Sequence, residues 1–307
     1  MAVTAQMVKE LREMTGAGMM DCKKALTETD GDMDKAVDYL RENGMAKAAK
    51  KAGRIAAEGI VFVKLAADWK TAVAVEVNSE TDFVAKNAEF RGFVEEVADQ
   101  ILASSAQDVE SLLAEPWLKD NSRTVEQVLA SKIATIGENL KIRRFERVPS
   151  AGAIAAYDHM NGKIGVLVNA EADGANGKVI TVLKDVAMQV AALSPRYVSR
   201  EEVDQEYINN EMEVLKNQAR NENPGKPENI LEQMVKGRLA KELREICLMD
   251  QAFVKDGDLT VAAYLEKMSK ELGSPIKVKS FVRFETGEGL EKKQENFADE
   301  VAKQMGM

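Results

Sequence analysis

The side chains that carry out covalent chemistry are sparse in this sequence. His159 is the only histidine, and it lies at a predicted hairpin turn, where histidine is more often a surface contact than a general base. We find no convincing Ser-His-Asp or Cys-His set around it. Cys22 and Cys247 are far apart in the chain, fit no metal-ligand spacing, and favour a reducing compartment over a disulfide framework. We therefore predict no catalytic residue.

The sequence also lacks the usual motifs for nucleotides and metal ions. The stretch "GANGKV" has neither the upstream glycine nor the following Ser or Thr of a phosphate loop. The glycine pairs at 16–18 and 287–289 have no third glycine at dinucleotide spacing and open no βαβ unit. No His/Cys cluster suits zinc, and no Asp-rich loop suits calcium. These patterns predict no cofactor and no metal, and they favour a protein that works through an interface over an enzyme.

The charge of the chain limits its partners. Charged residues make up 30% of the sequence and the formal net charge is −9, so the chain repels nucleic acid on average. A short basic helical face formed by Lys47, Lys50, Lys51 and Arg54 is either a solvated linker helix or a face for docking or for contacting phosphates. The overall charge favours the first interpretation, and we predict no nucleic-acid partner.

Hydropathy gives no sign of a membrane segment. No apolar run approaches the roughly 20 residues that a membrane-spanning helix needs. The start, "MAVTAQMVKELREM", is amphipathic and charged and lacks the apolar stretch of a secretory signal. We therefore expect a cytoplasmic protein without a membrane partner.

The stretch "NSETDFVAKNAEF" (78–90) joins a strand-like run to a helix-like run. We predict a helix over about 83–104, with a core stripe that begins at Phe90 and continues through later apolar positions. Phe83 stands seven residues before Phe90, so it is either the first core residue of this helix or a ring presented to a partner. Lys86 and Asn87 interrupt the stripe between the two rings.

The N-terminal residues 3–44 read as three short helices. The first contains Val8 and Leu11, "TGAG" ends it, and the second covers 19–28. The third ends at Gly44. Adjacent helical positions point about 100° apart, so at least one of Met19 and Met20 is expected to face the core. Three helices of this length bury only a modest core, and we expect the module to lean on a partner.

Periodicity changes from helical to alternating after residue 59. "GIVFVKL", "TAVAVEVN" and "LKIRRFERV" read as strands, and residues 105–139 as helical connections. The pattern then recurs in "GAIAAYDHMNGKIGVLVNAEA", with Asn161-Gly162 as a two-residue turn. A helix over 182–193 and the strand "IKVKSFVRFE" follow. We predict an α+β fold with two related halves, each a short antiparallel sheet with a long helix.

A helical hairpin interrupts the second half at about 196–246. Its second arm carries an apolar stripe at coiled-coil-like spacing, formed by Leu231, Val235, Leu239, Leu243 and Ile246. This stripe packs either against the other arm of the same chain or against a second copy. The tail over 286–307 reads as a final amphipathic helix with Leu290, Phe297 and Val301.

Several stretches together resemble the bacterial elongation factor Ts family. They are "VKELREMTGAGMMDCKKAL", "VNSETDFVAKN", "KIATIGENLKIRR", "GKIGVLV" and "SFVRFETGEGLEKK", and they occur in the family's order across nearly the whole chain. The resemblance implies a guanine-nucleotide exchange factor for the GTPase elongation factor Tu, which acts without covalent chemistry. It implies four modules: a three-helix module like a ubiquitin-associated domain (1–55), two core halves (56–148 and 149–285), a dimerisation hairpin within the second half, and a C-terminal helix (286–307).

The resemblance also assigns site residues. Thr81, Asp82, Phe83 and Val84 match the segment that intrudes on the GTPase and disturbs its Mg²⁺ site. The remaining GTPase contacts match Met19, Met20, Lys23, Ile136, Gly137, His159 and Met234, with Val235 beside the last. The resemblance also implies a homodimer through the hairpin and thus a 2:2 complex. The alternative function is an adaptor that binds a partner protein through its N-terminal module and does not change nucleotide kinetics.

Overall fold

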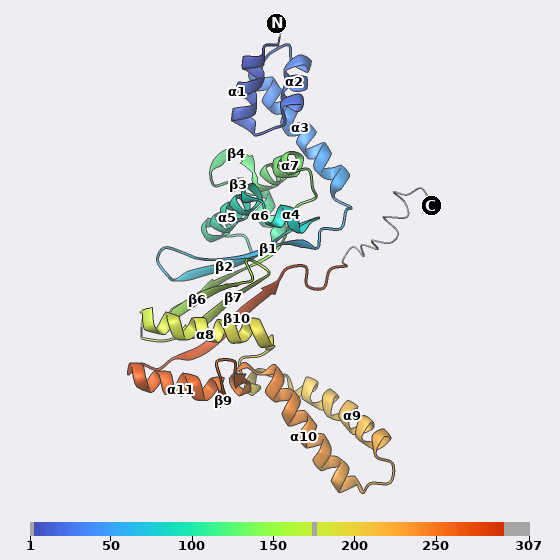
Figure 1. Cartoon of the computed structure of the whole chain (residues 1–307), viewed down its shortest axis with the longest axis vertical. Helices are drawn as coiled ribbons and strands as arrows, with labels where there is room; N and C mark the ends of the chain where they lie inside the picture. The colour runs from blue at the N-terminus through green and yellow to red at the C-terminus, as the bar shows by residue number, and fades with distance from the viewer. Residues whose placement is uncertain (1–2, 174–176, 292–307) are drawn as a thin grey trace.

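Two three-stranded antiparallel sheets, packed face to face, lie at the centre of the molecule (Figure 1). This computed structural model describes residues 3–173 and 177–291. The N-terminal helices extend from one end and a helical hairpin from the other. The α+β prediction is confirmed. Of the expected tail helix over 286–307, residues 286–290 form turns and a bend, and the part with Phe297 and Val301 lies outside the described residues.

The two sheets have the same strand order. In each, the middle strand is the second of the three along the chain, flanked by the first and the third. The strands of the first sheet are β1 (Glu58–Leu65), β2 (Thr71–Ser79) and β5 (Lys141–Pro149). Those of the second are β6 (Ala153–His159), β7 (Ile164–Glu171) and β10 (Lys277–Glu285).

The middle strands are buried on both faces because helices cover the outer face of each sheet. Along β2, the valines pack toward α5 (Ala88–Ala103), while Ala72 and Ala74 face the second sheet. Such small residues let the sheets approach closely. Gly165 of β7 is an extreme case, since a Cβ there would lie 2.5 Å from Cγ1 of Val61.

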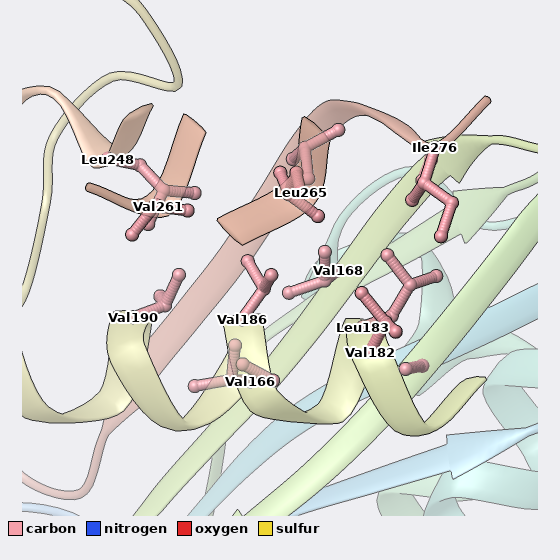
Figure 2. Close-up of a cluster of buried hydrophobic side chains, with 14 of the residues drawn as sticks. Val166, Val168, Val182, Leu183, Val186, Val190, Leu248, Val261, Leu265 and Ile276 are labelled. Atoms are coloured by element: carbon pink, nitrogen blue, oxygen red, sulfur yellow. The ribbon is translucent and has the colours of Figure 1, made fainter. Parts of the chain in front are cut away.

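Helix α8 (Gly177–Leu193) covers the second sheet in the same way. Figure 2 shows this core, in which Val186 and Val190 of the helix meet side chains of β7 and of the segment that includes Leu248 and Val261. The result is a helix–sheet–sheet–helix sandwich.

Each half also contains a small hairpin followed by a helix, which the sequence analysis missed in residues 105–139. In the first half these are β3 (Pro116–Trp117), β4 (Asp120–Thr124) and α7 (Val125–Ile136), after α6 (Val109–Ala114). In the second they are β8 (Ala252–Phe253), β9 (Asp256–Thr260) and α11 (Val261–Leu272), after the 3₁₀ turn Leu248–Asp250.

A buried glutamine fixes this small hairpin in both halves. The side-chain oxygen of Gln100 accepts the N–H of Leu118 at 2.6 Å, and that of Gln189 accepts the N–H of Val254 at 2.8 Å. Each side-chain amide also donates to a carbonyl of the first strand of its hairpin, at 3.2 and 3.0 Å. The same two hydrogen bonds from a buried glutamine in both halves confirm that the halves are related.

The N-terminal module consists of α1 (Ala5–Thr15), α2 (Met19–Glu28) and α3 (Met33–Lys51) around a small core that includes Leu11 and Leu26. The prediction that the third helix ends at Gly44 is wrong. Gly44 is buried where α3 passes α7, and the helix continues past it. A Cβ at this glycine would lie 3.8 Å from the carbonyl oxygen of Ala130. Lys47, Lys50 and Lys51 therefore belong to α3, and Arg54 follows the end of the helix.

The helical hairpin consists of α9 (Gln205–Glu222) and α10 (Glu228–Ile246), after the 3₁₀ turn Arg200–Glu202. The predicted stripe of α10 packs in the same cluster as Leu215 and Ala219 of α9. The hydroxyl of Tyr207 donates to a carboxylate oxygen of Glu242 at 2.6 Å and adds a polar link between the arms. Of the two alternatives for the stripe, the structure shows the one within a single chain.

A buried carboxylate joins the two halves. Glu76 of β2 is fully buried, and its oxygens accept hydrogen bonds from Arg143 at 2.9 Å, Arg144 at 2.6 Å and the backbone N–H of Gly287 at 2.8 Å. Gly287 follows β10 of the second half, with φ +73°, and a Cβ there would lie 2.1 Å from the carbonyl oxygen of Ala57. The interaction therefore ties the end of the second sheet to the middle of the first.

Candidate functional site

The segment after β2 forms a single helical turn, α4 (Asp82–Ala85), separate from α5. Thr81 caps its start, and its hydroxyl oxygen accepts the N–H of Val84 at 3.4 Å. Asn87 then caps α5, since its side-chain oxygen accepts the N–H groups of Glu89 and Phe90. The prediction of one helix over 83–104 is therefore wrong, because a cap at Asn87 starts a new helix axis.

Phe83 points away from the core. Its side chain is 81% exposed, whereas Phe90 is fully buried. Ala85 is buried and Val84 is partly buried against the core of the first half, so the turn is anchored on one side and presents Phe83 on the other. Of the two interpretations of this ring, the structure supports presentation to solvent. An exposed aromatic ring on an anchored turn is a typical contact for a partner.

Asp82 precedes the ring and remains accessible. Its carboxylate lies 2.6 Å from the ammonium of Lys86, and the side chain is 47% exposed. The hydrogen bond from Lys86 holds the pKa of Asp82 below its ordinary value. The carboxylate also lines a cavity of about 260 Å³ together with Met160, Asn161 and Lys163. The turn therefore offers an anion beside an apolar ring.

Glu138 connects this turn to the loop after α7. One of its carboxylate oxygens accepts the N–H groups of Glu80 and Thr81, both at 3.0 Å, and the other accepts the hydroxyl of Thr81 at 2.6 Å. The structure thus brings Ile136 and Gly137 next to the segment that carries Asp82. Glu138 lies in the block "KIATIGENLKIRR", but no local pattern in the sequence marks it as a site residue.

The N-terminal methionines are both on the surface. Met19 is 59% exposed and Met20 is 74% exposed, and Lys23 is exposed as well. The prediction that one methionine faces the core is wrong, because α2 begins at Met19 and its inward stripe starts only at Cys22. Two large apolar side chains at a helix start form an accessible contact surface.

His159 ends β6 and lies beside a connection that differs from the predicted two-residue turn. His159 pairs with Ile164, so the connection spans residues 160–163, and its first three residues all have positive φ. The Nδ1 of His159 lies 3.0 Å from the hydroxyl of Tyr157. Arg91 of α5 donates to the backbone and side-chain oxygens of Asn161 at 3.2 and 3.1 Å. These bonds hold the loop next to the first half.

Met234 lies far from the other site residues. It belongs to α10 in the helical hairpin, at the opposite end of the molecule from α1–α3 (Figure 1). Met234 is partly buried, and its neighbour Val235 is 3% exposed within the hairpin core. Val235 is therefore a core residue, and the structure does not bring Met234 to Phe83.

The basic face of α3 is largely used within the chain. Lys47 pairs with Asp21 at 2.8 Å, Lys51 donates to the carbonyl of Ile133 at 3.4 Å, and Arg54 pairs with Glu80 at 3.3 Å. The contacts of Lys51 and Arg54 fasten the N-terminal module to the first half, whereas the Lys47 pair joins α3 to α2 within the module. They count against a phosphate-contacting face.

The fold and the site define a class of protein that exposes large apolar side chains at separate places on an α+β frame. Within residues 3–173 and 177–291, no group of three or more His, Cys, Asp or Glu side chains is arranged to hold a metal ion. Across the same ranges, no helix combines the length and the apolar character needed to cross a bilayer.

Comparisons with known proteins define the class further. A family model described as elongation factor TS matches residues 80–288. The chain is 57% identical to elongation factor Ts of Clostridioides difficile and 56% identical to that of Clostridium novyi, over 99% of each chain. It is 54% identical to elongation factor Ts of Clostridium perfringens strain 13, again over 99% of both chains. The chain belongs to the elongation factor Ts family, which confirms the resemblance seen in the sequence.

Proposed function

We propose that this protein is a guanine-nucleotide exchange factor for elongation factor Tu. Membership of the elongation factor Ts family supports this role in general. The observation that carries the proposal for this chain is the exposed ring of Phe83 on a turn that is capped and anchored. We expect the protein to work in the cytoplasm, where bacterial translation takes place.

The mechanism is one of differential binding. An exchange factor accelerates GDP release when it binds the nucleotide-free GTPase more tightly than the loaded one. The coupling is reciprocal, so GTP rebinding in turn weakens the factor. Burying a phenylalanine side chain stabilises a complex by about 2 kcal/mol, which corresponds to roughly thirtyfold in an equilibrium constant. No covalent step, proton transfer or resident cofactor is needed.

Phe83 and Asp82 supply two different contributions. The ring enters the region of the phosphate loop and displaces it from its nucleotide-bound position. The carboxylate of Asp82 repels phosphate oxygens, and as a hard oxygen donor it competes for the GTPase's Mg²⁺. Both effects disfavour bound GDP and leave the nucleotide-free state less affected. Thr81 and Val84 hold the turn from either side.

The other contacts spread the complex along the long axis of the molecule. Met19, Met20 and Lys23 bind from the N-terminal module, Ile136 and Gly137 bind beside the phenylalanine, and His159 and Met234 bind a further part of the GTPase. These separate contacts each contribute to the affinity, whereas the turn that carries Asp82 and Phe83 displaces GDP.

We also propose that the helical hairpin forms a homodimer, so that the active assembly is 2:2. The stripe of α10 is covered within the chain, but the hairpin exposes further apolar side chains, Met212, Val214 and Ile230, at 37%, 47% and 44%. These residues are available to a second copy.

The test is GDP release from purified elongation factor Tu loaded with a fluorescent GDP analogue and chased with excess unlabelled GDP. We expect the full-length protein to raise the release rate in a dose-dependent and saturable way. The adaptor alternative predicts binding to a partner through the N-terminal module with an unchanged release rate. Unchanged release at saturating protein would overturn the proposed function.

A further inference from the structure

Glu80 and Glu138 exchange hydrogen bonds between two segments that are far apart in sequence. The carboxylate of Glu138 accepts the backbone N–H groups of Glu80 and Thr81, both at 3.0 Å. In return, the carboxylate of Glu80 accepts the backbone N–H of Asn139 at 2.6 Å. Arg54 lies 3.3 Å from the Glu80 carboxylate and offsets part of the negative charge. This reciprocal clamp joins the start of α4 to the end of α7.

The clamp lies between regular elements, where backbone N–H groups have no hydrogen-bond partner within a sheet or a helix. The pairing of β1 with β2 ends at Ser79, and the first N–H groups of a helix have no partner within it. On the other side, α7 ends at Ile136, and its C-cap Gly137, with φ +90° in the left-handed region, turns the chain just before Glu138. A charged acceptor at this position forms stronger hydrogen bonds than a neutral one.

Thr81 links Glu138 to the helical turn α4. Its hydroxyl donates to Glu138 at 2.6 Å, and its oxygen accepts the N–H of Val84 at 3.4 Å. The donated proton fixes the hydroxyl's orientation, which leaves its lone pairs for the helix cap. Glu138 therefore holds the N-cap residue of α4, and Phe83 is the second residue of that helix.

We propose that Glu138 is a positioning residue for nucleotide exchange. It holds the turn that carries Asp82 and Phe83 in a fixed relation to Ile136 and Gly137, so that both segments meet the GTPase as one preorganised surface. Preorganisation lowers the entropic cost of ordering loops on binding. This inference rests on the proposed function, since it assigns Glu138 a part in the action of Phe83.

The first test compares Glu138→Ala with Glu138→Gln in the GDP-release assay. Alanine removes all the acceptors, whereas glutamine keeps one oxygen for the N–H groups and can donate its amide to Thr81. We expect Glu138→Ala to lower the maximal release rate at saturating protein by about tenfold to a hundredfold, as for other misplaced groups. Glu138→Gln should retain most of the rate. Glu96→Ala, which removes a surface glutamate paired with Lys119, is the matched control and should leave the rate unchanged.

A double-mutant cycle separates positioning from a contact made by Glu138 itself. If Glu138 acts through the ring, Glu138→Ala should change the rate less than twofold in a Phe83→Ala background. Independent, additive losses would overturn the proposal. A full rate in the Glu138→Ala single variant would overturn it as well.

Hydrogen exchange on the free full-length protein gives a readout that does not depend on the GTPase. We expect Glu138→Ala to speed amide exchange in a peptide that covers residues 80–86, with a peptide from α5 unchanged. Unchanged exchange in residues 80–86 would refute the clamp. Faster exchange there, in a protein whose wild type does not accelerate GDP release, would refute the proposed function and leave the clamp standing.

Discussion

Phe83 and Phe90 are separated by one heptad, yet Phe83 is 81% exposed and Phe90 is fully buried. On a continuous helix, residues at this spacing lie on nearly the same face. The two rings differ because α4 ends at Ala85 and the side chain of Asn87 caps a new helix. Because of this break, the side chain of Phe83 is exposed to solvent and does not pack in the core.

This relationship predicts that Phe83→Ala separates function from stability. Loss of an exposed side chain should change the free energy of unfolding by less than about 0.5 kcal/mol, while GDP release from elongation factor Tu falls strongly. The matched control is Trp69→Ala, which removes a 48% exposed ring at the turn between β1 and β2. This control should leave the release rate unchanged.

The measurements are thermal unfolding and saturating GDP release on the same preparations. A loss of about 3–5 kcal/mol in Phe83→Ala, as expected for a buried phenylalanine, would show that the ring supports the core. Equal effects of Phe83→Ala and Trp69→Ala on the GDP-release rate would show that Phe83 has no specific part in nucleotide exchange.

Much of this local structure could be predicted from the sequence. The strand before residue 80 and the core stripe from Phe90 followed from periodicity, as did the paired halves and the helical hairpin. The break at Asn87 also had a local signal, since Asn is a preferred N-cap residue. The apolar stripe after Asn87 is the stronger pattern, and it favours one continuous helix over a cap at this position.

Other features had no local signal. Glu138 reaches Thr81 across 57 residues of sequence, and periodicity says nothing about such contacts. The exposure of Met19 depends on where α2 begins, because its inward stripe starts at Cys22. The small hairpins in each half contain a two-residue strand, which is too short to produce an alternating pattern.

The repeated glutamine predicts equal losses of stability in the two halves. Gln100→Ala and Gln189→Ala each remove two hydrogen bonds from a buried side chain to the hairpin backbone, so each should cost about 1–3 kcal/mol. Urea unfolding gives the values, and Gln107→Ala is the control because that side chain is exposed and donates only to the nearby carbonyl of Ser105. A cost below about 1 kcal/mol in either half would show that its hairpin does not depend on the glutamine.

The buried carboxylate of Glu76 predicts a pH-dependent link between the halves. Burial by itself raises the pKa of Glu76, but hydrogen bonds from Gly287, Asn78, Arg143 and Arg144 stabilise the charged form and hold the net pKa below the ordinary 4.5. A group with a lowered folded-state pKa contributes stability that is present above about pH 4.5 and is lost as the pH falls through the folded-state value.

Glu76→Gln should therefore cost about 3–5 kcal/mol at neutral pH, because both arginines lose their buried partner. The difference between wild type and variant should narrow as the pH of the unfolding measurement falls below about 4.5. Glu288→Gln, which alters a half-exposed partner of Arg144, should have a much smaller effect. A difference that stays constant across this pH range would contradict the charged state of Glu76.

The helical hairpin provides the last prediction, because its two apolar surfaces should respond differently. Leu239 is 9% exposed and packs between the arms, so Leu239→Ala should destabilise the hairpin by about 2–5 kcal/mol. A triple substitution of Met212, Val214 and Ile230 by serine removes exposed side chains and should leave the helical circular dichroism unchanged.

Sedimentation then reports whether those exposed side chains join two copies. We expect the wild-type protein to sediment as a dimer and the triple variant as a monomer, since a second copy would cover apolar side chains that the hairpin exposes. A wild-type monomer at high concentration would rule out the 2:2 assembly. A triple variant that remains dimeric would place the interface elsewhere, because the stripe of α10 is already covered by α9.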